Sequence, residues 1–277
     1  MKKFLISICF SFLIFSNLFG QNFGGGVTDF DGNTYQTIII GNQEWMAENL
    51  RVTHYSNGDI IETVMDNNIW ASLNVGLYCH WLNDSNNDII KGLHYNWYAV
   101  IDSRNVCPLG WRVPSNNDWL FLIDNAGGLS NAGYNLKSIG TIQDGNGLWD
   151  SPNYASNSTG FNVRPNGYRD ESGWGGGSNS YFRLWTSSLD TSNPARAIFW
   201  NGQNWTQNVY DESHEKMLGI PLRCIKESSN GLNQLQDSQK KIIKIIDLLG
   251  RDTDLKTNTI LIYLFDDGSS ERILINE

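Results

Sequence analysis

The residues best suited to bind a metal ion are two histidines and an acidic turn. His80 and His94 have no third ligand at the spacing of a zinc site, so structural roles are favoured for both. Asp29, Asp31 and Asn33 alternate as calcium ligands do, but the Glu that would complete such a loop is missing, and a hairpin turn explains them. We therefore predict no metal site and no cofactor.

Catalytic groups are not found at productive spacings. The run Gly173-Trp174-Gly175-Gly176-Gly177 follows no strand and precedes no helix or lysine, so it is not typical of a phosphate-binding loop. Asp170 and Glu171 are adjacent, whereas the two carboxylates of a glycosidase lie on opposite sides of the scissile bond. We predict no catalytic residues, and a hydrolytic or oxidative enzyme is the less favoured alternative.

Aromatic residues are the remaining candidates for function. The chain has 11 Trp, and isolated aromatics recur through the Gly- and Asn-rich loops of residues 131–180. Such rings either anchor loops to the core or offer a face on which a sugar stacks. The candidate ligand contacts are Trp149, Trp174, Trp200 and Trp205. The favoured function is a recognition module that binds a glycan or a surface protein, and the alternative is a purely structural surface protein.

The N-terminus has the pattern of a secretory signal peptide. Lys2 and Lys3 precede an apolar run from Phe4 to Phe15, which is too short to span a bilayer, and small or polar residues follow up to Gly20. We expect residues 1–20 to be removed and the protein to be secreted or held at the outer cell surface. No second apolar stretch follows, so no integral membrane span is expected.

The charge of the chain excludes one class of partner. Its formal net charge is −9, and removal of the two signal lysines would make it more negative. An acidic protein repels phosphate backbones and anionic lipid headgroups, so nucleic-acid binding and electrostatic membrane docking are not expected.

Three cysteines follow the signal segment: Cys79, Cys107 and Cys224. An oxidising compartment would allow one disulfide among them, in three alternative pairings. We favour Cys107 with Cys224, because each lies beside an arginine and apolar residues in a segment with core character. In the chain-entropy model, closing a loop of this length would stabilise the folded state by roughly 4–5 kcal/mol.

A capped helix is the clearest single element. Ser115 and Asp118 have the spacing of a capping box, Pro114 prevents extension backward, and apolar residues from Trp119 to Ala126 recur at helical spacing. Gly127-Gly128 is expected to end the helix.

Strands are expected on both sides of this helix. Residues 27–52 predict hairpins around Asp31-Gly32-Asn33 and Gly41-Asn42, and residues 93–100 predict a strand that runs into a short helix. Residues 181–226 predict an antiparallel meander with a type I′ turn at Asn201-Gly202. We expect the N-terminal hairpin to join it, so that both ends of the domain share one sheet.

The C-terminal residues form a separate unit. Residues 227–239 read as a polar linker, and residues 240–277 as a small all-β tail with strands at 240–246, 260–265 and 271–276. The tail is too short to bury a robust core.

Five sequence blocks closely resemble the Fibrobacter succinogenes major paralogous domain, a family of secreted bacterial proteins. The resemblance covers about residues 27–226. The blocks are Asp31-Gly32-Asn33 with Tyr35, Gly41 to Arg51, Tyr95 to Ala99, Cys107 to Ser115 with Asp118-Trp119, and Leu184 to Ser188 with Gly219 to Cys224.

The same helix and closing strands also resemble the C-type lectin fold and its relative, the formylglycine-generating enzymes. That resemblance implies an α+β domain with a curled antiparallel sheet, one or two helices and long loops. The segments that match the lectin calcium loops read Arg164-Pro165-Asn166 and Trp200-Asn201-Gly202, and each lacks a required acid. A redox cysteine pair of the enzyme type would need more than Cys79.

The tail resembles the type A sorting domain of type IX secretion in Bacteroidetes. The matching residues are Asp247 to Arg251, Ile260 to Tyr263, Asp267-Gly268 and Arg272 to Ile275. The resemblance implies the secretion machinery as a partner of the tail and passage of the protein across the outer membrane.

Overall fold

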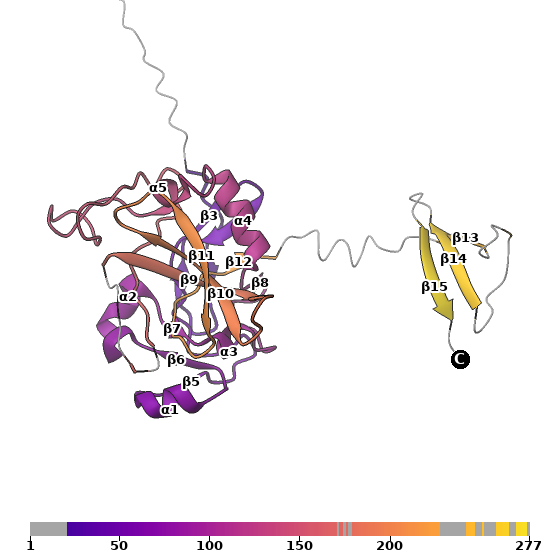
Figure 1. Ribbon diagram of the computed structural model, residues 1–277, viewed down its shortest axis with the longest axis horizontal. Coiled ribbons are helices and arrows are strands. Elements are labelled where there is room, and N and C mark those ends of the chain that lie inside the picture. Colours follow the sequence, from indigo (N-terminus) through magenta and orange to yellow (C-terminus); the bar gives the residue numbers. More distant parts are fainter. Residues whose placement is uncertain are drawn as a thin grey trace, which may run out of the picture. The chain divides into compact units, whose positions relative to one another are not determined.

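The computed structural model describes residues 21–170, 172–173, 176, 179–227, 242–246, 251, 259–265 and 270–275. The chain divides into two compact units, Met1–Lys226 and Glu227–Glu277. The first unit mixes short helices with several small sheets, which confirms the expected α+β class (Figure 1).

A four-stranded sheet brings together the two ends of the first unit. Its order is β3-β4-β12-β8, with neighbours antiparallel. The strands are β3 (Thr37–Ile40), β4 (Gln43–Met46), β12 (Ile225–Lys226) and β8 (Trp111–Arg112). The N-terminal hairpin therefore pairs with the last strand of the domain, as predicted. A smaller hairpin of β1 (Val27–Thr28) and β2 (Thr34–Tyr35) surrounds the predicted Asp31-Gly32-Asn33 turn.

A second, three-stranded sheet forms the first part of the meander predicted for residues 181–226, whereas the last strand of that region, β12, pairs in the four-stranded sheet instead. The three-stranded sheet has the order β11-β10-β9, from β9 (Tyr181–Leu189), β10 (Arg196–Gln203) and β11 (Val209–Glu215). The meander is a sheet of its own and does not include the N-terminal hairpin, which corrects the expectation that one sheet holds both. The third sheet pairs β5 (Glu62–Thr63), β6 (Leu77–Cys79) and β7 (His94–Tyr95).

The prediction of a hairpin turn at Asn201-Gly202 is wrong. Both residues lie inside β10, opposite Tyr210 and Val209 of β11, and the chain turns over residues 204–208 instead. A Cβ on Gly202 would lie 2.4 Å from Cε1 of Phe182 on the neighbouring strand. The glycine is therefore needed for close packing within the sheet and not for a turn.

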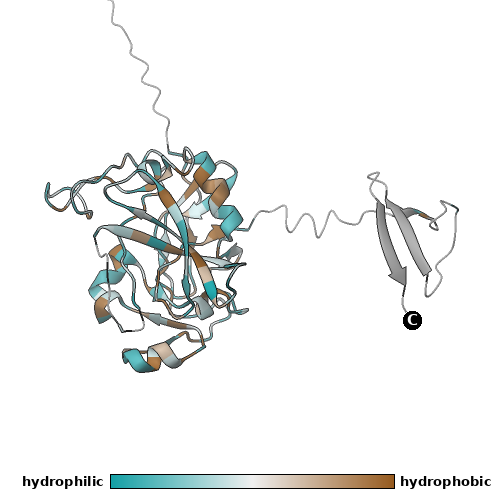
Figure 2. Ribbon diagram, in the orientation of Figure 1, coloured by the Kyte–Doolittle hydropathy of each residue, from teal (hydrophilic) through white to brown (hydrophobic). Residues whose placement is uncertain are grey.

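The helices of the first unit are short. They are α1 (Asn67–Ser72), α2 (Asp88–Lys91), α3 (Trp97–Val100), α4 (Asn116–Asn125) and α5 (Ala132–Leu136), with 3₁₀ turns at Trp81–Asn83 and Ser85–Asn87. The strand β7 followed by α3 confirms the predicted strand-to-helix segment. In α4, hydrophobic and hydrophilic residues are interleaved, and the helix lies against β9 and β10 (Figure 2).

The N-terminus of α4 has the predicted capping box. The Asp118 amide donates to Ser115 Oγ at 3.3 Å, and the Ser115 amide donates to Asp118 Oδ2 at 2.7 Å. Arg112 of β8 holds the same carboxylate with two hydrogen bonds, of 2.7 and 2.8 Å. Burial opposes ionisation, but the bonds from Arg112 and Ser115 outweigh it and lower the pKa of Asp118.

Removing this cap should destabilise the domain modestly. We expect Ser115→Ala to lower the free energy of unfolding by about 1 kcal/mol, because an amide of the first turn loses its acceptor. Urea denaturation followed by tryptophan fluorescence measures the change. Ser115→Thr keeps the hydroxyl and should retain most of the stability; equal losses in both variants would contradict a capping role.

Two large aromatic-rich clusters, and a small third one of Trp70, Leu77 and Cys79, form the core of the described part of the first unit. One surrounds Tyr95, Trp97 and Trp185, and it includes the disulfide between Cys107 and Cys224. The disulfide confirms the favoured pairing and joins the segment before β8 to the strand that pairs with it. The other cluster is built on edge-to-face contacts among Trp45, Trp119 and Phe161, which couple β4, α4 and the long loop. Cys79 is buried as a free thiol.

The second unit is a three-stranded antiparallel sheet in the order β13-β14-β15. Its strands, β13 (Ile242–Ile246), β14 (Thr259–Phe265) and β15 (Ser270–Ile275), agree with the three strands predicted for the tail.

Candidate functional site

Two of the four tryptophans proposed as ligand contacts are core residues. Trp149 and Trp200 are 0% and 1% exposed. The Trp149 indole donates to Ser138 Oγ at 2.9 Å, and the Trp200 indole donates to Asn116 Oδ1 at 2.8 Å. A buried indole packs its rings on apolar neighbours and satisfies its one donor internally, and both residues do so. The expectation that Trp149 and Trp200 contact a ligand is therefore corrected. Trp174 lies outside the described residues.

Trp205 lies at the surface, where a ligand can reach it. It is 45% exposed, on the turn between β10 and β11. Its ring meets that of Tyr181 edge-on, with centroids 5.2 Å apart and an interplanar angle of 87°. Tyr154, itself 49% exposed, lies next to this turn, because its amide donates to the Asn204 carbonyl at 3.0 Å. We call Tyr154, Tyr181 and Trp205 the Trp205 surface.

Polar groups lie directly beside the Trp205 surface. Asn204 Nδ2 donates to the Asp150 carbonyl at 2.8 Å, and Ser180 Oγ donates to the Asp150 carboxylate at 2.7 Å. These contacts tie three chain segments together around the exposed rings. The surface thus combines aromatic faces with fixed hydrogen-bonding groups, which is the combination that small polar ligands require.

A buried lysine holds the turn that carries Trp205. Lys137, directly after α5, is fully buried. Its Nζ donates to the carbonyls of Gln203 at 2.7 Å, Thr206 at 2.8 Å and Asn204 at 3.3 Å. An ammonium group has three donors, and all three hold this one turn. Burial lowers the pKa of Lys137 to about 7. Sequence analysis missed this residue, since nothing in the sequence around it marks a lysine as buried.

A hollow of about 350 Å³ is the second surface feature of interest. Four carboxamide side chains line it, from Gln21, Gln36, Asn157 and Asn162. Glu48, Arg164 and Phe23 complete the polar and aromatic part of its wall. We call it the amide-lined hollow.

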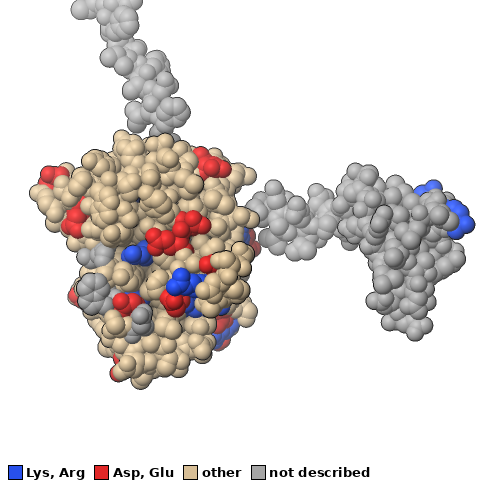
Figure 3. Space-filling model, viewed as in Figure 1, with Lys and Arg blue, Asp and Glu red and all other residues tan. Residues whose placement is uncertain are grey.

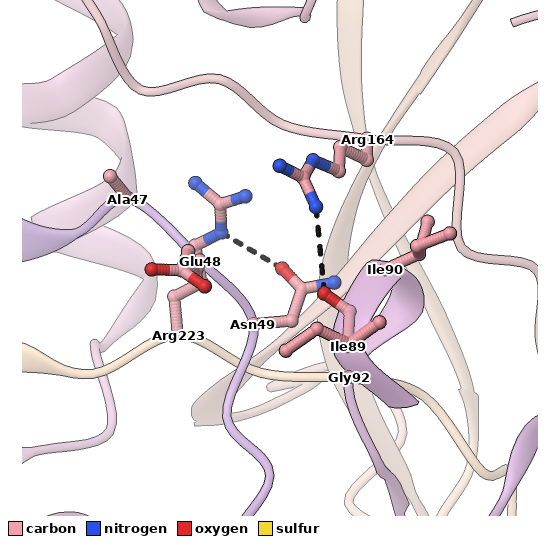
Figure 4. Close-up of a pocket in the computed structure, with 8 residues that line it drawn as sticks. All are labelled: Ala47, Glu48, Asn49, Ile89, Ile90, Gly92, Arg164 and Arg223. Atoms are coloured by element: carbon pink, nitrogen blue, oxygen red, sulfur yellow. Dashed lines mark hydrogen bonds between the residues drawn. The ribbon is translucent and has the colours of Figure 1, made fainter. Parts of the chain in front are cut away.

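A narrower pocket shares Ala47, Glu48 and Arg164 with this hollow (Figure 4). It has room for a single water molecule, at about 10 Å³, and Arg223 lies on its wall.

Arg223 is a buried cation held by neutral oxygens. Its Nε donates to Asn49 Oδ1 at 2.9 Å, and its guanidinium also donates to the carbonyls of Phe161 and Asn162. Burial lowers the pKa of Arg223 to about 9; the positive charge of Arg164 acts in the same direction, and Glu48 opposes it. Sequence analysis treated Arg223 only as a neighbour of the disulfide.

His54 lacks the arrangement of a catalytic triad. His54 Nδ1 contacts Asp31 Oδ1 at 2.5 Å and Thr53 Oγ1 at 3.2 Å, so acid and hydroxyl meet the same ring nitrogen. A catalytic triad needs them on opposite nitrogens. Across the described residues, no group of three or more His, Cys, Asp or Glu side chains is arranged to hold a metal ion.

The acidic turn is used structurally. Asp29 accepts the Asn33 amide at 2.9 Å and the Tyr35 hydroxyl at 2.6 Å. These bonds close the β1–β2 hairpin, as the sequence interpretation required.

Charge is sparse on the face seen in Figure 3, where small acidic and basic groups lie among uncharged residues. Among the helices that the structure describes, none combines the length and hydropathy of a membrane-spanning segment.

A family model described as the Fibrobacter succinogenes major domain matches residues 38–226. This range includes β4 to β12, all but the first residue of β3, and both surface features apart from Gln21, Phe23 and Gln36. No curated protein and no solved structure matches the chain.

Proposed function

Because the chain belongs to the Fibrobacter succinogenes major domain family, as its sequence blocks predicted, we propose that it is a non-catalytic recognition module that binds a glycan through the Trp205 surface. The observation that carries the proposal is the exposed, edge-packed indole of Trp205. Tyr181 packs against the Trp205 indole, and the Lys137 ammonium holds the turn that carries Trp205. The indole is therefore already ordered, and little conformational entropy is lost when a sugar ring stacks on it.

A surface protein is the alternative ligand for the same aromatic surface, and a purely structural surface protein is the alternative without a ligand. An exposed Trp packed against a Tyr also suits a protein interface, where these residues are enriched. The partly exposed Asp150 and Ser180 favour a hydroxyl-rich ligand, because they place polar groups beside the rings, whereas the buried Asn204 only holds the turn. A hydrolytic or oxidative enzyme is the least favoured reading.

The proposal includes a cell-surface or secreted location and a C-type lectin-like fold. The signal pattern of residues 1–20 and the resemblance of the tail to a type IX sorting domain support export. The three-stranded sheet of β13, β14 and β15 is compatible with such a tail, whose partner would be the secretion machinery. The α+β architecture with long loops supports the lectin-like assignment.

The Trp205 surface can be tested by one substitution. We expect Trp205→Ala to weaken glycan binding at least tenfold, about 1.4 kcal/mol, with the free energy of unfolding changed by no more than about 0.5 kcal/mol. A glycan array followed by calorimetry with the best ligand measures both the specificity and the loss.

The matched control is Phe30→Ala, which removes an aromatic side chain of similar exposure from the β1–β2 turn. This variant should bind as the wild type does. Wild-type binding that survives Trp205→Ala, or a wild type that binds no glycan on the array, would count against the proposal; capture of a surface protein through Trp205 would favour the alternative ligand.

A further inference from the structure

The amide-lined hollow has the size and lining of a ligand site. Its volume of about 350 Å³ lies within the range of small-molecule pockets. Within the wall, Gln21 Nε2 donates to the Asn157 carbonyl at 2.8 Å, and Asn157 Oδ1 accepts the Asn162 amide at 2.9 Å. The Gln36 carboxamide, Gln21 Oε1 and Asn162 Nδ2 are the groups that offer donors and acceptors to a ligand, and Phe23, 56% exposed, provides one aromatic surface. Such a lining suits a ligand with several hydroxyl groups.

The amide-lined hollow and the narrow pocket beside it carry more positive than negative charge. The side chains that line the hollow and its narrow extension include two arginines, Arg164 and Arg223, and one acid, Glu48. Glu48 is already engaged, because it accepts Arg51 Nη1 at 3.1 Å and the Gln36 amide at 3.1 Å. In a chain of net charge −9, this is a local excess of positive charge.

Arg164 is the cation that a ligand can reach. Among the described residues it forms no ion pair, and its one hydrogen bond, Nη1 to the Ile89 carbonyl, is long at 3.5 Å. A bond at the limit of hydrogen-bonding distance is weak, so little is lost when Nη1 turns to another acceptor. In Figure 4 the Asn49 carboxamide lies between the guanidinium groups of Arg164 and Arg223.

We propose that the amide-lined hollow binds an acidic sugar residue, with Arg164 holding the sugar carboxylate and the carboxamides of Gln21, Gln36 and Asn162 holding its hydroxyls. Arg binds a carboxylate through two parallel hydrogen bonds, which gives both affinity and orientation. The buried positive charge of Arg223, in the adjoining narrow pocket, also attracts the carboxylate. A phosphate dianion is disfavoured, because the Glu48 carboxylate lies on the same wall and only one guanidinium is open to the ligand.

This proposal extends the proposed glycan recognition to a second subsite with its own residues. The experiment uses the full chain and two matched probes, D-galacturonate and D-galactose, which differ in the carboxylate alone, with inorganic phosphate as a third probe. Calorimetry or NMR titration at low and high salt gives the affinities. We expect galacturonate to bind at least tenfold more tightly than galactose and to weaken as salt is raised.

Substitutions connect this binding to the hollow. Arg164→Gln should reduce galacturonate affinity at least tenfold, while Arg164→Lys should retain part of it, since the charge remains and the fork geometry is lost. Phe30→Ala, which changes an exposed aromatic residue outside both surface features, should leave galacturonate binding unchanged. Unfolding curves of each variant check that the fold is intact.

The outcomes separate the two proposals. Equal affinity for galactose and galacturonate, no effect of Arg164→Gln, or equally tight phosphate binding would each overturn the acidic-sugar site. Glycan binding that depends on Trp205, without galacturonate binding, would overturn this inference and leave the proposed function standing. Galacturonate binding that depends on Arg164, without any ligand at Trp205, would support this inference and overturn the proposed function of the Trp205 surface.

Discussion

Removal of the Cys107–Cys224 disulfide should lower the free energy of unfolding by about 4–5 kcal/mol, the largest effect that we expect from any local change. The two cysteines are 117 residues apart in sequence, so the bond closes a loop over about half of the unfolded first unit. Both lie in the core cluster around Tyr95 and Trp185, where the cross-link also holds β8 and β12 together. Because small domains are stable by only about 5–15 kcal/mol, such a loss would leave the domain marginal.

The measurement is urea denaturation of the wild type and of the Cys107→Ala/Cys224→Ala double variant. The matched control is Cys79→Ala, which removes a buried sulfur atom without breaking a cross-link. We expect its free energy of unfolding to fall by about 1 kcal/mol. Burial raises the pKa of Cys79 to about 11, so this thiol should stay unreactive toward thiol reagents while the domain is folded. A double variant no less stable than Cys79→Ala would contradict a stabilising role for the disulfide.

Acid should destabilise the domain through His94. This side chain is fully buried, and its Nε2 donates to the Asn166 carbonyl at 3.0 Å. Burial lowers the pKa of His94 to about 3, with a smaller contribution from the charge of Lys91, whereas an unfolded histidine titrates near 6.5. Below about pH 6.5 the unfolded chain binds a proton that the folded chain does not, so stability falls as the pH falls toward 3.

The size of this effect follows from the pKa difference. The free energy of unfolding should be about 2 kcal/mol lower at pH 5 than at pH 7, and it should continue to fall down to about pH 3. Above pH 7 this histidine contributes no pH dependence. Carboxylates titrate mostly below pH 5, so the interval from pH 7 to 5 is the one in which to measure it.

The test compares urea denaturation at pH 7 and pH 5 for the wild type and His94→Gln. The glutamine amide can still donate to Asn166, but it does not ionise, so the variant should lose less stability between the two pH values by about 2 kcal/mol. Other titrating groups cancel in this difference. Equal pH dependence in the two proteins would show that His94 does not account for the acid sensitivity.

Features that depend on neighbours in sequence were predicted correctly. The Ser115–Asp118 capping box, the Asp31-Gly32-Asn33 turn and the strand-to-helix segment at residues 93–100 all form as expected. Each is specified by hydrogen bonds or backbone preferences within a few residues, so tertiary packing did not need to be known. The family was likewise identified from ordered sequence blocks.

Errors arose where packing between distant segments overrides a local signal. Asn201-Gly202 has the composition of a tight turn, yet the close approach of Phe182 requires a glycine there inside a strand. Trp149 and Trp200 lie in loop- or turn-like sequence, yet both rings fill the core. A tryptophan carries the same local pattern whether it is buried or exposed, so only the contacts of the folded chain distinguish these two from Trp205.

The sequence by itself determined the family, the α+β class, the helix cap, the two N-terminal hairpins and the favoured pairing of Cys107 with Cys224. Only the tertiary structure decided which tryptophan reaches the surface, that Lys137 holds its turn, and that Arg164 and Arg223 meet Glu48 at the narrow pocket beside the hollow. Those residues come from segments far apart in the chain, and the burial of a charge depends on everything packed around it. Local sequence carries no measure of that environment, and the folded chain does.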